Sequence, residues 1–447
     1  MKNFKNWLMA GVLALGLSAC DQMLDVNPVL SIDDKTALLT ADDVRVTLTG
    51  AFDGLSSGVF YGGAVQYTGE LLGDDREVVF GGTYTTLDEF YRKTITTSNV
   101  DVRDIWAQGY ATINRANHVL ASLDKVSGAD KGYFEGQALF IRGVVYFELS
   151  RLFGKAWGDG DNNTNLAVPL VLTPTLAVTE ADYKSRNTVA AVYAQVLEDL
   201  NKAATLLPTN VEDGVVTKDA ALAMLSRVYL MQGNYAAARD AANSVISSGN
   251  YDLTSSFGAA FADNTASPEM IFSIVVSEQD GVNNMNTFYA STDNQGRGDI
   301  RVQTKHLALY EAGDERSKFF ETVNNRVFTL KFADQYGDVP MVRLAEMYLT
   351  RAECNQRLGT TIGAAPKDDV NRIRKRAGLS DLTAVTLNDI LRERKLELAF
   401  EGHQIHDIKR TKGSVGTTAF SANNLILPIP QREMDTNNKL VQNPGYN

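Results

Sequence analysis

The chain has 447 residues, of which 44% are hydrophobic and 22% are charged, so it can build one large domain or two to three modest ones and is not wholly disordered. Its 54 acidic and 43 basic residues give a net charge of −11, and no local basic patch is evident, which argues against a nucleic-acid partner. The two cysteines, Cys20 and Cys354, provide neither a disulfide framework nor a cysteine metal site.

Residues 1–19 are predicted to be a signal peptide. Two lysines precede an apolar stretch from Trp7 to Leu17, which is too short to cross a bilayer of about 30 Å as a helix. The following Leu17-Ser18-Ala19-Cys20 has the pattern of a lipobox, so Cys20 is expected to carry lipid and to begin the mature protein. The alternative is an ordinary signal peptide with a chance cysteine. Residues 20–40 are interpreted as a lipidated tether.

Helical periodicity dominates the rest of the chain, which predicts a mainly α fold. Apolar residues recur at helical spacing over several long segments: 105–128, 134–153, 189–207, 220–232, 235–247, 341–358, 368–377 and 387–400. Glu269–Ser277 and Arg326–Phe332 are predicted to be short strands. Residues 62–99 are rich in Gly, Thr and Tyr without a helical stripe, and are predicted to be a long irregular loop of functional importance.

One pair of predicted helices has the spacing of a tetratricopeptide hairpin. Large and aromatic residues at Leu225, Tyr229 and Tyr235 surround Gly233 and the small Ala238, a pattern that lets one helix pack closely on the next. The sequence therefore predicts a tetratricopeptide-like helix-pair scaffold with long irregular loops and a few short β-strands. The alternative is a set of unrelated alanine-rich amphipathic helices.

Several motifs resemble the SusD/RagB family of nutrient-binding outer-membrane lipoproteins of the Bacteroidetes. They lie in the same order as in the family, from the start of the mature chain to its end. The motifs are CDQMLDVNP (20–28), ALFIRGVVYFELSRLFG (138–154), MVRLAEMYLTRAEC (341–354), DVNRIRKRAGL (369–379), ERKLELAFEGHQIHDIKR (393–410) and LILPIPQREMDTNNKLVQNPGYN (425–447).

This resemblance implies an N-terminal helical region with binding loops (41–268) and a C-terminal SusD/RagB region (269–447). It implies a lipid-anchored protein of the outer membrane that faces the exterior, binds an oligosaccharide and delivers it to a SusC-like TonB-dependent transporter. A peptide-binding importer subunit of the RagB type is the alternative within the family, and a glycoside hydrolase is the alternative from another class.

The charged residues of the C-terminal motif do not predict catalysis. Glu393, Arg394, Glu397 and Glu401 follow one another at helical spacing, where charged pairs stabilise a helix or its packing. Glycoside hydrolysis needs two carboxylates on opposite sides of a sugar, which a single helix face does not supply. We therefore expect no enzyme activity.

No metal or cofactor is expected. His403 and His406 lack a third ligand of clear origin. The loop Asp159–Asn165 alternates Asp and Asn as a calcium-binding loop does, but Thr164 replaces the glycine of its turn and Leu170 the bidentate glutamate. A solvated polar loop is favoured over a loose calcium site.

Candidate ligand-binding residues are the aromatic and polar side chains of three predicted loops, because rings cover the apolar faces of sugars and polar groups bind their hydroxyls. For each ring, packing in the core is the competing interpretation. The candidates are Asp75, Arg76, Tyr84 and Tyr91 in the first loop, Trp157 in the second, and Phe288, Tyr289, Asn294 and Arg297 in the third.

Overall fold

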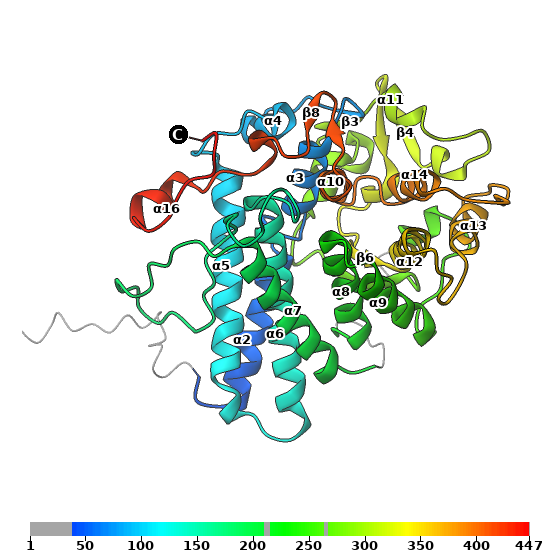
Figure 1. The fold of residues 1–447 in the computed structure, drawn as a ribbon. Coiled ribbons are helices and arrows are strands. Elements are labelled where there is room, and N and C mark those ends of the chain that lie inside the picture. Colours follow the sequence, from blue (N-terminus) through cyan, green and yellow to red (C-terminus); the bar gives the residue numbers. More distant parts are fainter. Residues whose placement is uncertain (1–37, 210–214, 263–266, 447) are drawn as a thin grey trace, which may run out of the picture.

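The computed structural model describes residues 38–209, 215–262 and 267–446 (Figure 1). The predicted signal peptide, Cys20 and nearly all of the predicted tether lie outside the described residues. In the described part of the chain, no helix combines the length and the apolar character that crossing a membrane requires.

One group of long helices forms the lower left of the molecule in Figure 1. α2 packs on α5, α5 on α6 and α6 on α7. Side chains are buried on every face of α6 from Gly136 onward, so this helix is the centre of the group. The helices are α2 (Ala41–Ser56), α5 (Val100–Ala121), α6 (Ala129–Phe153) and α7 (Val189–Leu206).

A second group of helices continues the scaffold to the right in Figure 1, where α8 packs on α9, α9 on α12, and α12 on α13 and α14. Gly233, with φ 71°, ends α8, and the Asn234 side chain accepts a hydrogen bond from Ala237 N to begin α9. The helices are α8 (Lys218–Gln232), α9 (Tyr235–Ser248), α12 (Leu344–Leu358), α13 (Pro366–Arg376) and α14 (Leu387–Glu397).

The predicted hairpin packing at Ala238 is confirmed. This residue has no exposed surface and lies in one apolar cluster with Leu230 of α8 and Cys354 of α12. A small side chain is needed where three helices meet. The mainly α, helix-pair scaffold predicted from the sequence is therefore the observed one.

Most of the short helices and strands lie above the scaffold in Figure 1, whereas β6 lies beside α12 and α16 lies at the left. Four antiparallel strands form a sheet in the order β1-β3-β5-β4, and β2 pairs separately with β6. The strands are β1 (Val78–Phe80), β2 (Met270–Ile274), β3 (Ile300–Val302), β4 (Phe320–Val323), β5 (Arg326–Thr329), β6 (Val339–Arg343), β7 (Ser414–Val415) and β8 (Thr418–Ala419). The short helices are α3 (Ala64–Gly73), α4 (Thr85–Arg92), α10 (Asn284–Tyr289), α11 (Thr304–Leu307), α15 (Gln404–Arg410) and α16 (Gln431–Thr436).

The prediction that residues 62–99 are irregular is wrong, because α3, β1 and α4 lie there. All ten residues of α3 are buried, so its sequence shows no alternation of polar and apolar faces. A Cβ at Gly69 would lie 2.8 Å from the carbonyl oxygen of Gly402, which explains a glycine inside this helix. Similarly, residues 341–343 belong to β6 rather than to a helix, and α14 ends at Glu397 instead of at residue 400.

Candidate functional site

The pairing of β1 with β3 brings two predicted binding loops together. Val78 lies opposite Val302 and Phe80 opposite Ile300, and Gly81 N donates a hydrogen bond of 2.8 Å to the carbonyl oxygen of Asp299. Gly82 has room only for hydrogen, since a Cβ there would meet the Asp299 carboxylate. The backbone of the segment after β1 therefore lies close against the segment before β3.

Tyr84 lies at this meeting point and exposes 47% of its surface. Its ring makes an edge contact of 5.5 Å between centroids with the buried ring of Phe288. Phe288 in turn contacts the buried Tyr67 of α3 at 5.1 Å. The exposed ring is thus supported by a rigid aromatic base, so little side-chain freedom would be lost when a ligand packs on it.

Arg297 lies beside Tyr84, with its guanidinium 4.8 Å from the centre of the ring. Its Nε donates a hydrogen bond of 3.0 Å to Asp299 Oδ2, and its Nη2 donates one of 3.1 Å to Thr83 Oγ1. Asp299 is 5% exposed, whereas the Arg297 side chain is 41% exposed. An exposed ring, an oriented guanidinium and a hydroxyl group are the features that contact the faces and hydroxyls of a sugar.

We define Tyr84, Arg297, Thr83 and Asp299 as the aromatic–arginine site. The sequence identified Tyr84 and Arg297 but not Thr83 or Asp299. The string Arg297-Gly298-Asp299 was a possible signal for Asp299, since the two charged side chains of this string form an ion pair.

Phe288 and Tyr289 are corrections to the predicted site. Tyr289 has no exposed surface, and its ring packs against Phe332 and Phe400 at 5.6 and 5.7 Å. Phe288 is 5% exposed and supports Tyr84 from below. Both residues lie on α10 rather than in a loop. A buried ring cannot stack on a ligand, so both side chains belong to the core.

Asp75, Arg76 and Tyr91 lie toward the opposite end of β1 from Tyr84. Asp75 Oδ2 is 2.5 Å from Lys305 Nζ, and the Arg76 side chain is 85% exposed. Lys93 Nζ, at the end of α4, donates to the carbonyl oxygens of Tyr91 and Asp74, which fixes that helix against the start of β1. These three predicted residues are not part of the aromatic–arginine site.

The two remaining predicted residues have other surroundings. Asn294 Nδ2 donates a hydrogen bond of 2.7 Å to Glu321 Oε1 and so fastens its loop to β4. Trp157 follows α6 and packs on Tyr193 of α7, with 5.1 Å between the ring centres. Trp157 lines a separate pocket, which also contains Lys409.

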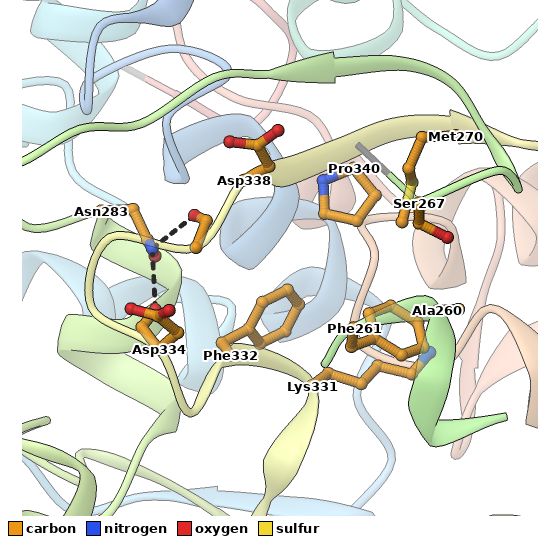
Figure 2. Close-up of a pocket in the computed structure, with 11 residues that line it drawn as sticks. Ala260, Phe261, Ser267, Met270, Asn283, Lys331, Phe332, Asp334, Asp338 and Pro340 are labelled. Carbon is orange, nitrogen blue, oxygen red and sulfur yellow. Dashed lines mark hydrogen bonds between the residues drawn. The ribbon is translucent and has the colours of Figure 1, made fainter. Parts of the chain in front are cut away.

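A pocket of about 30 Å³ lies between β6 and the Lys331–Phe332 segment (Figure 2). Its polar groups already have partners within the protein. Lys331 Nζ donates to the carbonyl oxygens of Glu397 and Ala399, both at 2.9 Å, and Asn283 Nδ2 donates to the carbonyl oxygen of Gly337 at 3.0 Å. The polar groups that line this pocket therefore stabilise the fold through these hydrogen bonds, and the pocket is not our candidate for ligand binding.

A larger cavity of about 140 Å³ lies between α3, α14 and α15. Leu391, Leu398 and Ile408 make its wall largely apolar. Burial raises the pKa of the Glu70 carboxyl to about 7, although the backbone N–H groups of Gln404 and Gly402 donate to it. The charged groups of this cavity are already paired within the protein: Glu70 accepts from Gly402 N, Arg394 binds Asp407, and Lys395 binds Glu77. The aromatic–arginine site, which has an exposed ring, is therefore the better candidate.

The acidic residues of α14 do not form a hydrolytic pair. Glu397 is fully buried and forms ion pairs with Arg343 and Arg376, and Glu393 forms one with Arg316. Their structural role is thus confirmed, although their partners lie on other elements rather than on the same helix. Within the described residues, no group of three or more His, Cys, Asp or Glu side chains has the arrangement of a metal site.

Comparison with known proteins decides the family. Residues 33–230 match a family described as starch-binding and associating with the outer membrane, and residues 318–422 match the SusD family. The chain belongs to the SusD/RagB family. The family matches cover the long-helix group and the motifs at 341–354, 369–379 and 393–410, but not the motif at 425–447.

Individual SusD-like proteins resemble the whole chain or a part of it. SusD-like protein P2 of Formosa agariphila is 26% identical over all of both chains. The starch-binding protein SusD of Bacteroides thetaiotaomicron is 32% identical, over 24% of this chain and 22% of that protein. The structure of a candidate sugar-binding protein from Bacteroides vulgatus superposes with a TM-score of 0.83 and 29% identity, covering 92% of this chain and all of that one.

Proposed function

We propose that this protein binds an oligosaccharide at the outer surface of the cell and delivers it to a SusC-like TonB-dependent transporter, without cleaving it. The observation that carries the proposal is the aromatic–arginine site, where Tyr84 is exposed on a buried aromatic base beside Arg297. The family description and the name of the Bacteroides thetaiotaomicron relative, a starch-binding protein, favour a glycan over a peptide.

The first experiment measures binding to the site. We expect calorimetric titration with neutral oligosaccharides, starting with malto-oligosaccharides, to identify a ligand for the wild-type protein. Tyr84→Ala and Arg297→Ala should each weaken its binding by about 1 kcal/mol, through lost ring contact or lost hydrogen bonds. Tyr183→Ala and Arg432→Ala change a half-buried tyrosine and an exposed arginine outside the site, and should leave affinity unchanged.

Two results would contradict this proposal. Binding of extended peptides in place of sugars would point to a peptide importer. New reducing ends after incubation with a polysaccharide would show hydrolysis.

The second experiment concerns the anchor. We infer from the lipobox ending at Cys20 that the mature protein is held at the outer membrane by lipid. Cys20→Ser should move the protein from the membrane fraction to the soluble fraction or leave the precursor uncleaved. Membrane attachment of a processed Cys20→Ser protein would refute lipid anchoring.

A further inference from the structure

A second pocket lies where the end of α6, the loop after it, α7 and α15 meet. Its volume is about 20 Å³, and its wall includes Arg151, Trp157, Tyr193 and Lys409. A cavity of this size holds a group little larger than one water molecule. Only a small head group can therefore enter, while the rest of a larger ligand would remain at the mouth.

Lys409 is the unusual member of this wall. It is 5% exposed, and its Nζ has neither a hydrogen bond nor an ion pair among residues 38–209, 215–262 and 267–446. Lys331, which is buried to a similar degree, instead donates to Glu397 O, Ala399 O and Glu401 Oε1. A buried ammonium group without a partner is costly, so an anion supplied from outside would complete the site.

Arg151 adds a second positive charge to the wall. Its Nη2 forms an ion pair with Glu148, but its buried Nε has no hydrogen-bond partner in the described structure. Burial, together with the nearby positive charge of Arg151, lowers the pKa of Lys409 to about 8. The Nε atom of Arg151 is enclosed, so Arg151 contributes charge to the wall while Lys409 Nζ supplies the free donor.

The other charges near the pocket do not cancel this excess. Arg410 is already bound by Glu353 and Asp407. Asp159 is the acidic group that acts on Lys409, and it also lies 3.9 Å from Lys155. His406 is buried, and burial lowers its pKa well below the usual value, so it is neutral at pH 7. Arg151, Lys155, Lys409 and Arg410 line the pocket, and its lining in the described structure includes no acidic side chain, so the wall is cationic.

The wall of the pocket also has an aromatic part. Trp157 is half-buried, and its ring meets Tyr193 at 5.1 Å with 50° between the ring planes. Rings beside a cationic pocket suit a ligand that has an apolar face next to an acidic group. A sugar acid has both features, whereas an inorganic anion uses only the cationic part.

We propose that this pocket binds a small anionic group, such as the carboxylate of a sugar acid or a free anion, through Lys409 Nζ, with the positive charge of Arg151 beside it. The site is separate from the aromatic–arginine site and does not depend on the proposed binding of neutral sugars. A carboxylate on a sugar ring would enter the pocket and leave the ring against Trp157.

Calorimetric titration at constant ionic strength tests the proposal with sodium glucuronate as the probe and glucose as its neutral counterpart. We expect glucuronate to bind at least tenfold more tightly than glucose. Lys409→Met should weaken glucuronate binding at least tenfold, and Lys409→Arg should preserve most of it. Lys412→Met is the matched control, since it removes an exposed lysine just beyond α15 and should have no effect.

Sodium acetate and sodium chloride distinguish the two sources of the anion. If the ligand is a sugar acid, Trp157→Ala weakens glucuronate binding and leaves acetate binding unchanged. If acetate and chloride bind as tightly as glucuronate and Trp157→Ala changes nothing, the site holds a free anion. In either case, the Lys409→Met variant should no longer bind anions more tightly than glucose.

The proposal is overturned if glucose and glucuronate bind alike, or if Lys409→Met binds glucuronate as the wild type does. It also fails if Tyr84→Ala abolishes glucuronate binding, because the sugar acid would then occupy the aromatic–arginine site. Wild-type tryptophan fluorescence gives a measurement that needs no variant. Glucuronate should change the emission of Trp157, whereas glucose should not.

Discussion

The hydroxyl group of Tyr289 is buried and has no hydrogen-bond partner within the described structure. Tyr289→Phe removes only this group, so the free energy of unfolding should stay the same or rise by about 1 kcal/mol. Tyr146→Phe is the matched control, because that buried hydroxyl donates to Val171 O and accepts from Val171 N. Tyr146→Phe should lower the free energy of unfolding by about 1–2 kcal/mol. If urea denaturation shows that both variants lose the same free energy of unfolding, the hydroxyl group of Tyr289 has a hydrogen-bond partner.

Glu70 makes stability depend on pH in the neutral range. Burial raises its pKa in the folded protein to about 7, above the value of about 4.3 for an unfolded chain. The folded state therefore holds its proton where the unfolded state has lost it, and stability falls as pH rises from about 4.3 to 7. The contribution of Glu70 should fall by about 2 kcal/mol between pH 5 and pH 8.

Glu70→Gln tests this dependence, since the amide oxygen can still accept from Gly402 N. Relative to the wild type, the variant should gain stability steadily from pH 5 to pH 8, as measured by urea denaturation. Glu278→Gln changes an exposed glutamate and should give a constant difference over the same range. A constant difference for Glu70→Gln would mean that this carboxyl titrates normally.

Ala238, where α8, α9 and α12 meet, tests the packing of whole elements. Ala238→Phe should lower the free energy of unfolding by about 1–3 kcal/mol, because a ring has no space between Leu230 and Cys354. Ala236→Phe places the same ring on the exposed side of α9 and should cost far less. Equal melting temperatures for the two variants would show that α9 is not held tightly against α12.

Helices that have one buried and one exposed face could be predicted from the sequence, whereas a helix that is buried on all sides could not. α5, α7 and α9 have buried and exposed faces and were all predicted as helices. The ends of α7 and α9 were predicted to within one residue, whereas α5 begins five residues before and ends seven residues before its predicted bounds. α3 is buried all round, and its glycines are explained only by the close approach of Gly402 and Ile405. Contacts between segments more than 300 residues apart leave no local periodicity in a sequence.

The same limit applies to the site. Tyr84 and Arg297 lie in two different predicted loops, and the β1–β3 pairing brings these loops together. Composition alone could not distinguish the exposed Tyr84 from the buried Tyr289, because both lie in polar, aromatic segments. Lys409 was missed because it lies within a family motif full of charged residues, and its lack of a partner appears only in three dimensions.

At the scale of the whole molecule, buried charges join the two regions predicted from the sequence. Arg227 of α8 binds Glu346 of α12 at 2.6 Å, and Arg394 of α14 approaches the same carboxylate at 3.4 Å. Arg394 also binds Asp407 of α15 at 2.9 Å. The chain of ion pairs crosses from residues 41–268 into residues 269–447, so we expect the two regions to unfold together.

Glu346→Gln tests this coupling. Glu346 is 1% exposed, and although burial alone would raise its pKa, the charges of Arg227, His403 and Arg394 hold that pKa well below its usual value. The variant leaves two buried guanidinium groups short of negative charge, so the free energy of unfolding at pH 7 should fall by about 3 kcal/mol. Glu315→Gln, which removes an exposed ion pair with Lys318, should cost under about 1 kcal/mol. Calorimetry should show one transition in both variants, and two separate transitions in Glu346→Gln would mean that this carboxylate alone couples the regions.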